Sequence, residues 1–376
     1  MGYDINQNMC QRCIMNRDVD PNIVFDDEGI CNHCRRYDRL VKARIYKDRE
    51  KTLQKIIHRI KSKGKGKKYD CIVGISGGVD SSYVAYLVTK LGLRPLAIHL
   101  DNGWNTEIAE QNINIITEKL GIDLITFHVD WDEFRDLQLS FLKSSTPDCE
   151  IPTDHAINAL LWREAARRKI KYIISGMNFS TESIRVDQWS YGHSDWRYIK
   201  NIQKMFGRIK LKKYPKFSYW DLFKYTVFDK IKVVSILNYI NYGKNNSKNI
   251  LIKELGWQDY QGKHFESVYT RFIQGYILPK KFGIDKRYGH LSDLINSGQM
   301  TREEALKAIK INSYSEELQE SDFKYVCRKL EIKRSELEEI INAPPKYFHD
   351  YKNSYQFVNL LKSFVNTLRK FNIYPK

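Results

Sequence analysis

The chain has 376 residues, of which 42% are hydrophobic, and a formal net charge of +17. This length predicts roughly two or three folded units with a substantial core. The sequence has neither an apolar run of about 18 residues nor a charged-then-apolar leader in residues 1–13, so we expect a cytoplasmic protein without membrane insertion. The basic charge suits phosphorylated small molecules, and we do not expect nucleic acid as a partner.

Two cysteine pairs lie near the start of the chain. Each pair has the pattern Cys-x2-Cys, and residues 14–30 separate them. This spacing lets two turns present four thiolates tetrahedrally to zinc, and cysteines in an intracellular chain favour metal over disulfides. The predicted ligands are Cys10, Cys13, Cys31 and Cys34. We expect a closed structural site that stabilises a zinc-ribbon lobe, with His33 as a bystander. An iron–sulfur centre is the alternative.

A basic segment, residues 37–68, has the pattern of an amphipathic helix that ends in a Lys/Gly linker near residue 66. Strand and helix patterns then alternate. Strands are expected at residues 70–75, 95–100, 123–129 and 171–176, and helices at residues 80–91, 106–120 and 153–169, the last with Thr153 as N-cap. This order predicts an α/β fold with a parallel, doubly wound sheet, right-handed crossovers and helices on both faces.

Beyond residue 180 the strand pattern fades, and aromatic, basic, helix-like segments continue along the chain. The predicted parts are a cysteine lobe at residues 1–36, a basic helix and linker at 37–66, the α/β domain at 67–200, and a mainly helical region for substrate or partner at 201–376.

A glycine-rich turn, GISGGVDSS at residues 74–82, joins the first expected strand of the sheet to a helix. Glycines let backbone amides approach an anion closely, and serine hydroxyls and the helix N-terminus add further donors. An ordinary P-loop carries a lysine, but here Asp80 stands in the loop and no lysine follows. A carboxylate among phosphates makes sense if it helps to hold Mg²⁺. The predicted loop residues are Ser76, Gly77, Gly78, Asp80, Ser81 and Ser82.

The stretch SGGVDSS resembles the pyrophosphate loop of the ATP pyrophosphatase superfamily, which includes asparagine, GMP and NAD synthetases and tRNA-thiolating enzymes. The resemblance implies an adenine nucleotide alpha hydrolase-like fold and cleavage of ATP between its α- and β-phosphates. Such enzymes adenylate a carbonyl oxygen, and a nitrogen or sulfur nucleophile then displaces AMP. The resemblance places His99 and Asp101 near the nucleoside, and Gly176 ends a later strand at the same carboxyl edge, where ligands bind in open α/β sheets.

A longer resemblance runs through EIPTDHAI, SGMNFSTES, GKHFESVYTRFIQGYILPKKFGIDKR and SGQMTREEAL, over approximately residues 8–310. Together these stretches resemble the N-acetyl sugar amidotransferase family, which supplies acetamidino groups to surface polysaccharides and flagellar glycans. The resemblance implies that an acetamide oxygen of a nucleotide-linked N-acetyl sugar is adenylated and that ammonia then attacks the activated carbon.

The source of ammonia is expected to be a separate subunit or solution. A fused glutaminase needs a nucleophilic cysteine at the mature N-terminus or on a glycine-flanked elbow. Gly2 follows Met1, and Cys71, Cys149 and Cys327 lie on no such elbow. The family resemblance favours a partner glutaminase with a cyclase-like, ammonia-channelling subunit.

Candidate residues for chemistry and substrate follow from the same stretches. Lys263 is expected to stabilise charge as pyrophosphate leaves, and the helix that starts near Asp154 is expected to face the cleft. The lysines around residue 280, with Lys286 and Arg287, suit a diphosphate. The catalytic candidates are Asp80, Lys263 and Glu182. The substrate candidates are Asp154, His155, Asn178, Thr181, Arg271, Lys280 and Lys281.

Two other functions are open from the sequence. A tRNA sulfurtransferase would use the same adenylation chemistry, with Cys149 as the candidate sulfur carrier. The other alternative is a non-catalytic module that binds zinc and nucleotide. The intact loop disfavours it, because such a module would not need the loop residues.

Overall fold

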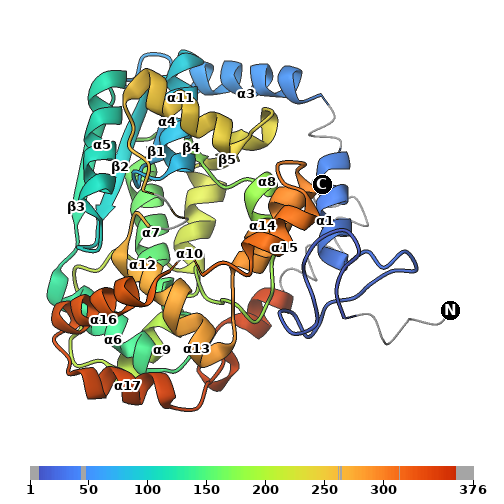
Figure 1. Ribbon diagram of the computed structural model, residues 1–376. Coiled ribbons are helices and arrows are strands. Elements are labelled where there is room, and N and C mark those ends of the chain that lie inside the picture. Colours follow the sequence, from blue (N-terminus) through green and yellow to red (C-terminus); the bar gives the residue numbers. More distant parts are fainter. Residues whose placement is uncertain (1–7, 44–47, 261, 263–264, 313, 361–376) are drawn as a thin grey trace.

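A computed structural model describes residues 8–43, 48–260, 262, 265–312 and 314–360 of the chain (Figure 1). Its centre is a five-stranded sheet in the order β3-β2-β1-β4-β5, in which every neighbouring pair is parallel. The strands are β1 (Cys71–Gly74), β2 (Pro95–Asp101), β3 (Asp123–His128), β4 (Tyr172–Ser175) and β5 (Lys232–Ser235). The predicted parallel sheet is confirmed, and the first four strands match the expected segments within two residues.

Helices cover both faces of the sheet, because β1 and β2 are apolar on both sides. Val73 of β1 belongs to a core shared with α4 (Val79–Lys90), α5 (Glu107–Leu120) and α11 (Lys244–Leu255). Ile72, which points to the other face, packs in a second core with α6 (Trp131–Lys143) and α7 (Ile151–Arg167). The fold is therefore doubly wound, as predicted.

The chain beyond the fourth strand is mainly helical. Most of it packs on the core that contains α6 and α7, whereas residues 236–239 and α11 pack on the core that contains α4 and α5. Its elements are α8 (Phe179–Glu182), α9 (Trp196–Phe206), α10 (Tyr219–Phe223), the π-helix η1 (Lys224–Phe228), the 3-10 helix η2 (Ile236–Tyr239), α12 (Val268–Phe272), the π-helix η3 (Ile273–Ile277), α13 (Leu278–Phe282), α14 (Arg287–Asn296), α15 (Arg302–Ala308), α16 (Glu316–Leu330), α17 (Arg334–Asn342) and the 3-10 turn η4 (Phe348–Asp350). Among the helices that the structure describes, none has both the length and the hydrophobicity of a membrane span.

Three sequence-based expectations need correction. The single helix expected over residues 37–68 is interrupted. In the part that the structure describes, α1 (Asn32–Lys42) ends where the backbone becomes extended at Ala43, and α3 (Arg49–Gly64) follows. Helix α7 begins before Thr153, whose hydroxyl instead accepts a hydrogen bond from Asn102.

The third correction is β5, a strand in the region expected to be helical. It is a short edge strand, half exposed, so its sequence KVVS carries no run of buried residues that could reveal it. The domain boundaries at residues 36, 66 and 200 stay a prediction.

Candidate active site

The glycine loop lies where the strand order of the sheet reverses. Strand β1 pairs with β2 on one side and with β4 on the other, so the loops after β1 and β4 leave the sheet next to each other. A Cβ atom on Gly176, which follows β4, would lie 3.4 Å from the carbonyl carbon of Asp80. Ligands of open α/β sheets bind in the crevice at this position.

Hydrogen bonds within the loop hold its backbone in a tight turn. The amide of Ser76 donates to Ser81 Oγ (3.2 Å), and that hydroxyl donates to the carbonyl of Gly78 (3.1 Å). The amide of Gly78 donates to Ser76 Oγ (3.4 Å). Ser76 is exposed, and Asp80 and Ser81 are half-buried, so these three predicted loop residues face the open edge of the sheet.

Only glycine fits at position 77. Its φ is +77°, and a Cβ atom there would lie 2.3 Å from the carbonyl oxygen of Ala109. Ser82, which we expected to donate to phosphate at the loop surface, is fully buried beneath the loop. Its Oγ has no hydrogen-bond partner among the described residues. This unpartnered hydroxyl and the N-terminus of α4 fit a loop that binds an anion such as pyrophosphate.

Side chains from far along the chain complete the loop. Trp257 Nε1 donates to the carbonyl of Gly77 (2.9 Å), and the amide of Val79 donates to the Tyr260 hydroxyl (3.3 Å). The Tyr242 hydroxyl donates to Asp80 Oδ1. Burial, with the charge of Asp80 and the hydrogen bond to it added, raises the pKa of Tyr242.

The sequence analysis missed these aromatic residues. Tyr242 and the segment Trp257–Tyr260 are separated from the loop by roughly 160 residues or more, and nothing in their local pattern points to a phosphate site. The only available signal is that WQDY lies one residue before the stretch GKHFES, which carried the family resemblance.

His99 is a correction, because it supports the loop from below. It is buried, its Nδ1–H donates to the carbonyl of Ile75 (2.9 Å), and its Nε2 accepts from the Asn105 amide (3.0 Å). Burial lowers its pKa, which favours the neutral imidazole. Asp101 remains at the strand end, where its carboxylate accepts from the Gly103 amide (2.9 Å) and contacts His128.

His155 is a second correction. We expected it to face the cleft, but it is fully buried, with its ring stacked 4.6 Å from that of Phe217. Its Nδ1–H donates to the carbonyl of His193, and its Nε2 accepts from the Phe217 amide, so both nitrogens serve the backbone. Burial lowers its pKa to about 4. Asp154 is half-buried and contacts His193 Nε2 at 3.1 Å.

Asn178 and Thr181 are also structural. The Asn178 side chain caps α8 by accepting from the amide (3.0 Å) and the hydroxyl (3.2 Å) of Thr181. Both residues are buried. They therefore hold the chain that follows β4 rather than presenting free groups to a substrate.

The basic residues of the helical region are mostly paired. Arg271 forms two hydrogen bonds with the Asp322 carboxylate, at 2.7 and 2.8 Å. Lys281, a substrate candidate, instead donates to the carbonyls of Ile340 and Ala343 at the end of α17, which corrects that prediction. Lys280 is exposed and donates to the Tyr276 hydroxyl. Lys263 lies outside the described residues.

A pocket of about 400 Å³ lies within the helical region, among residues 262–319. It is lined mainly by polar and charged side chains: Gly262, Phe265, Arg271, Gln274, Gly275, Pro279, Asp285, Lys286, Arg287, His290, Asn312, Tyr314 and Gln319. Phe265 connects the pocket to the loop, because the carboxylate of the next residue, Glu266, lies 3.6 Å from where a Cβ on Gly78 would be. The pocket is thus the nearest candidate for an acceptor substrate.

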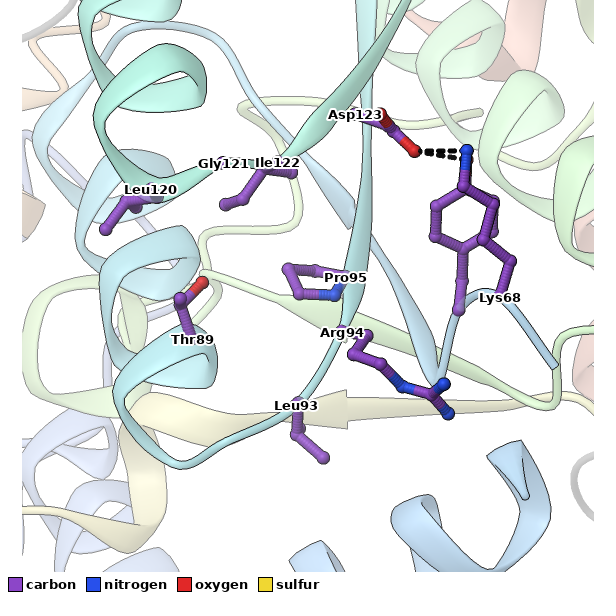
Figure 2. Close-up of a pocket in the computed structure, with 10 residues that line it drawn as sticks. Lys68, Thr89, Leu93, Arg94, Pro95, Leu120, Gly121, Ile122 and Asp123 are labelled. Carbon is purple, nitrogen blue, oxygen red and sulfur yellow. Dashed lines mark hydrogen bonds and ion pairs between the residues drawn. The ribbon is translucent and has the colours of Figure 1, made fainter. Parts of the chain in front are cut away.

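A second pocket, of about 300 Å³, lies at the amino ends of the strands (Figure 2). Residues Pro95 and Asp123, which begin β2 and β3, line it. Its charged groups satisfy one another, since Lys68 contacts the Asp123 carboxylate at 2.8 Å. Because it opens at the edge opposite the glycine loop, it is not part of the candidate active site.

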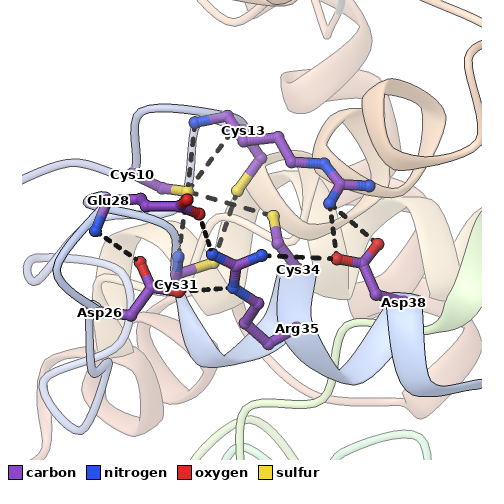
Figure 3. Close-up of polar contacts among 9 residues, drawn as sticks. Cys10, Cys13, Asp26, Glu28, Cys31, Cys34, Arg35 and Asp38 are labelled. Atoms are coloured by element: carbon purple, nitrogen blue, oxygen red, sulfur yellow. Dashed lines mark hydrogen bonds and ion pairs between the residues drawn. The ribbon is translucent and has the colours of Figure 1, made fainter.

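The four predicted metal ligands converge in the N-terminal lobe. Their sulfur atoms are buried and all lie within 4.8 Å of one another, with Cys13 and Cys31 3.7 Å apart (Figure 3). Tetrahedral zinc–thiolate bonds of about 2.3 Å require sulfur atoms roughly 3.8 Å apart, so the cluster fits zinc. Amides of Arg12, Cys13 and Cys31 point at Cys10 Sγ. His33 instead contacts Asp20 at 2.8 Å and is a bystander, as predicted.

The cysteine lobe is held against the helical region, beside α14 and α15 (Figure 1). The Arg302 guanidinium donates to the carbonyls of Cys10 (3.3 Å) and Cys13 (3.2 Å). The amide of Ile14 donates to Ser292 Oγ (3.3 Å). In the described residues the lobe contributes no side chain to the pocket among residues 262–319.

Comparison with known proteins follows the same division of the chain. Residues 45–151 match the NAD synthase family, and residues 266–364 match the family described as LPS biosynthesis protein WbpG-like, C-terminal domain. An uncharacterized protein of Methanocaldococcus jannaschii is 26% identical over 52% of this chain and 65% of its own length. The glutamine-hydrolyzing GMP synthase of Pyrobaculum aerophilum is 34% identical over 27% of this chain and 19% of its own length. The chain thus spans less than two thirds of either relative.

Two solved structures are similar in part. An NH3-dependent NAD synthetase from Campylobacter jejuni is 19% identical, with a TM-score of 0.28, over 35% of this chain and 58% of that one. An NMN synthetase from Francisella tularensis is 16% identical, with a TM-score of 0.32, over 72% of this chain and 95% of that one. The chain thus combines a segment that matches the NAD synthase family, which contains the glycine loop, with a later segment that matches the WbpG-like C-terminal domain.

Proposed function

We propose that the protein is an ATP-dependent, AMP-forming amidotransferase that converts the N-acetyl group of a nucleotide-linked sugar to an acetamidino group. The observation that carries the proposal is the way the WbpG-like region begins on the nucleotide loop domain. The Thr106 amide donates to the carbonyl of Glu266 (2.9 Å), and the Val268 amide donates to the carbonyl of Trp104 (3.0 Å). The domain associated with LPS biosynthesis therefore starts at the edge where ATP would be activated.

The proposed chemistry needs activation because an acetamide is a poor electrophile. The amide oxygen attacks the α-phosphorus of ATP, pyrophosphate leaves, ammonia attacks the resulting imidate carbon, and AMP departs with the former amide oxygen. Loop amides and the hydroxyls of Ser76 and Ser81 would bind pyrophosphate, and Asp80 would hold Mg²⁺. Glu182 and Lys263 remain candidates for proton transfer and for charge stabilisation.

The pocket among residues 262–319 is the proposed acceptor site. Lys286 and Gln274 both contact the Glu150 carboxylate, at 3.3 and 2.8 Å, where α7 begins. Arg287 is paired with Asp285 at 2.7 Å. These cations would recognise the diphosphate of a nucleotide sugar by exchanging a carboxylate partner for a phosphate.

A separate glutaminase, with an ammonia-channelling subunit, is the proposed nitrogen source. Cys71, Cys149 and Cys327 are all buried, and burial raises the pKa of each thiol.

The sulfurtransferase alternative is weakened by Cys149. Its side chain is 2% exposed, and burial raises its pKa to about 12. A sulfur carrier needs an accessible thiol with substantial thiolate character. Cys149→Ser should therefore leave activity unchanged.

The test is turnover by the purified chain with ATP, Mg²⁺, ammonium and a panel of UDP- and CMP-linked N-acetyl sugars. We expect AMP and pyrophosphate to appear together with a sugar whose mass has changed by replacement of O with NH. AMP formation only on addition of tRNA would overturn the proposal in favour of thiolation. Glutamine should replace ammonium only when the partner is present, and full glutamine-dependent activity of the chain alone would refute the partner.

A further inference from the structure

The helical run formed by α10 and η1 exposes large apolar side chains to solvent. Trp220 is 80% exposed, Phe228 70% and Phe223 47%. The opposite side of the run is already packed, because Leu222 lies against the core and the Tyr225 ring stacks 6.0 Å from Trp162 of α7. The exposed side chains are therefore a second apolar face rather than part of the core.

These side chains form one patch, which we call the aromatic patch: Trp220, Phe223, Val227 and Phe228. Residues 220, 223 and 227 follow the spacing of one helical stripe. The ring centroids of Trp220 and Phe223 are 6.2 Å apart, and those of Phe223 and Phe228 are 5.8 Å apart. Contiguous exposed apolar surface of this kind marks an interaction site.

The charged residues that flank the patch in the sequence are mostly lysines. Lys216, Lys224, Lys230 and Lys232 are all exposed. The last three form no ion pair within the described part of the chain. Two acidic residues also lie in this segment, but the Asp221 carboxylate accepts from the amide (2.8 Å) and hydroxyl (2.7 Å) of Ser218. The other acidic residue is Asp229. With four lysines and two aspartates, residues 216–232 carry a net positive charge.

We propose that the aromatic patch and its lysines dock this protein on the surface of an anionic phospholipid bilayer. Exposed tryptophan and phenylalanine enter the boundary between headgroups and acyl chains, and lysines beside them are attracted to anionic lipids. Lysine is depleted in protein–protein interfaces, which disfavours a protein partner, and a second copy of the chain would bring two positive rims together. The proposal is independent of the proposed reaction.

The test uses the full chain in vesicle flotation, with phosphatidylglycerol/phosphatidylethanolamine vesicles and phosphatidylcholine vesicles. We expect binding to the anionic vesicles only, weakened at high ionic strength. Lys224→Glu/Lys230→Glu/Lys232→Glu should reduce the partition coefficient on the order of 100-fold, from about fivefold per lysine. Trp220→Ala/Phe228→Ala should reduce it by about tenfold or more. All these side chains are exposed, so melting temperatures should not change.

Matched controls remove similar groups elsewhere on the surface. We expect near wild-type vesicle binding from two control variants, Lys253→Glu/Lys310→Glu and Ile311→Ala, whose original side chains are exposed, Ile311 to 64%. Any decrease for the lysine variant should be no larger than its change in net charge explains. Tryptophan fluorescence should shift to the blue on anionic vesicles, and Trp220→Phe should abolish that shift while retaining binding.

Three outcomes would overturn the proposal. They are equal binding to neutral and anionic vesicles, no vesicle binding at all, or equal loss of binding in the control and patch variants. A dimer or protein complex in solution that Trp220→Ala/Phe228→Ala disrupts, without vesicle binding, would assign the patch to a protein partner instead.

Discussion

The cysteine cluster takes all four of its sulfur atoms from residues 10–34, whereas the glycine loop at residues 76–82 is completed by side chains from residues 242–266. The cluster is closed, with every sulfur buried. The loop is open at the sheet edge, with Ser76 exposed. A structural metal site can be specified by local spacing alone. A site that must admit and activate a substrate depends on side chains from several parts of the fold.

The largest expected effect is on the cysteine lobe. Cys10→Ser should abolish stoichiometric zinc and unfold the lobe, because apparent zinc binding energies of about 10–16 kcal/mol in zinc-finger peptides are folding energy. Zinc content by mass spectrometry and amide exchange of residues 8–43 measure both. Cys327→Ser, outside the cluster, is the control. Protected lobe amides in a metal-free protein would contradict the prediction.

The next effect is on the loop carboxylate. Asp80→Asn preserves the shape of the side chain and its contact with Tyr242 but removes the charge proposed for Mg²⁺. AMP formation should fall by about 10²–10³-fold, the usual loss of one electrostatic contact to a transition state. Asp187→Asn, an exposed carboxylate, should have wild-type activity. Wild-type turnover by Asp80→Asn would remove this residue from the chemistry.

A matched glycine pair separates backbone strain from close packing. Gly121 has φ +61° and open space around it, so Gly121→Ala should cost about 1–2 kcal/mol of unfolding free energy. Gly77→Ala meets the same strain and also the Ala109 carbonyl, which adds about 1–3 kcal/mol. Denaturant unfolding measures both. Equal costs would show that the loop can move away from α5.

The smallest effect is expected at Trp257, which contacts the loop from about 180 residues further along the chain. Trp257→Phe removes one of two donors to the Gly77 carbonyl, since Asn112 also donates to it, and should cost about 0.5–1.5 kcal/mol, together with weaker ATP binding. Equilibrium unfolding and nucleotide titration measure the two. Trp220→Phe, at an exposed position, should change neither. If Trp257→Phe leaves ATP affinity intact, Trp257 contributes to stability but not to nucleotide binding.

Local signals account for much of the fold. Helix α5 begins at Thr106, whose hydroxyl accepts from the Ala109 amide, and ends at Gly121 in the left-handed conformation. Such caps depend on residues that are close in the chain, so they can be predicted directly from the sequence. Strand β5 is half exposed at a sheet edge and has no comparable signal.

The assignment of polar side chains to roles was the weaker part. His99, His155 and Lys281 belong to stretches that suggest a binding cleft, yet each is engaged by backbone groups of other segments. A histidine in a strand or at a helix start reads the same in sequence whether it faces a cleft or a packed core.

The sequence by itself determined the grouping of the four cysteines, the alternating α/β order and the glycine turn between strand and helix, because each rests on contacts between residues close in the chain. Only the tertiary structure decided which candidates share a site. Tertiary packing brings the Tyr242 hydroxyl into hydrogen-bond contact with Asp80 and Trp257 with the Gly77 carbonyl, and it buries His155 in an aromatic stack. These choices depend on how helices pack across the sheet, and packing brings together residues whose separation in sequence carries no record of their contact.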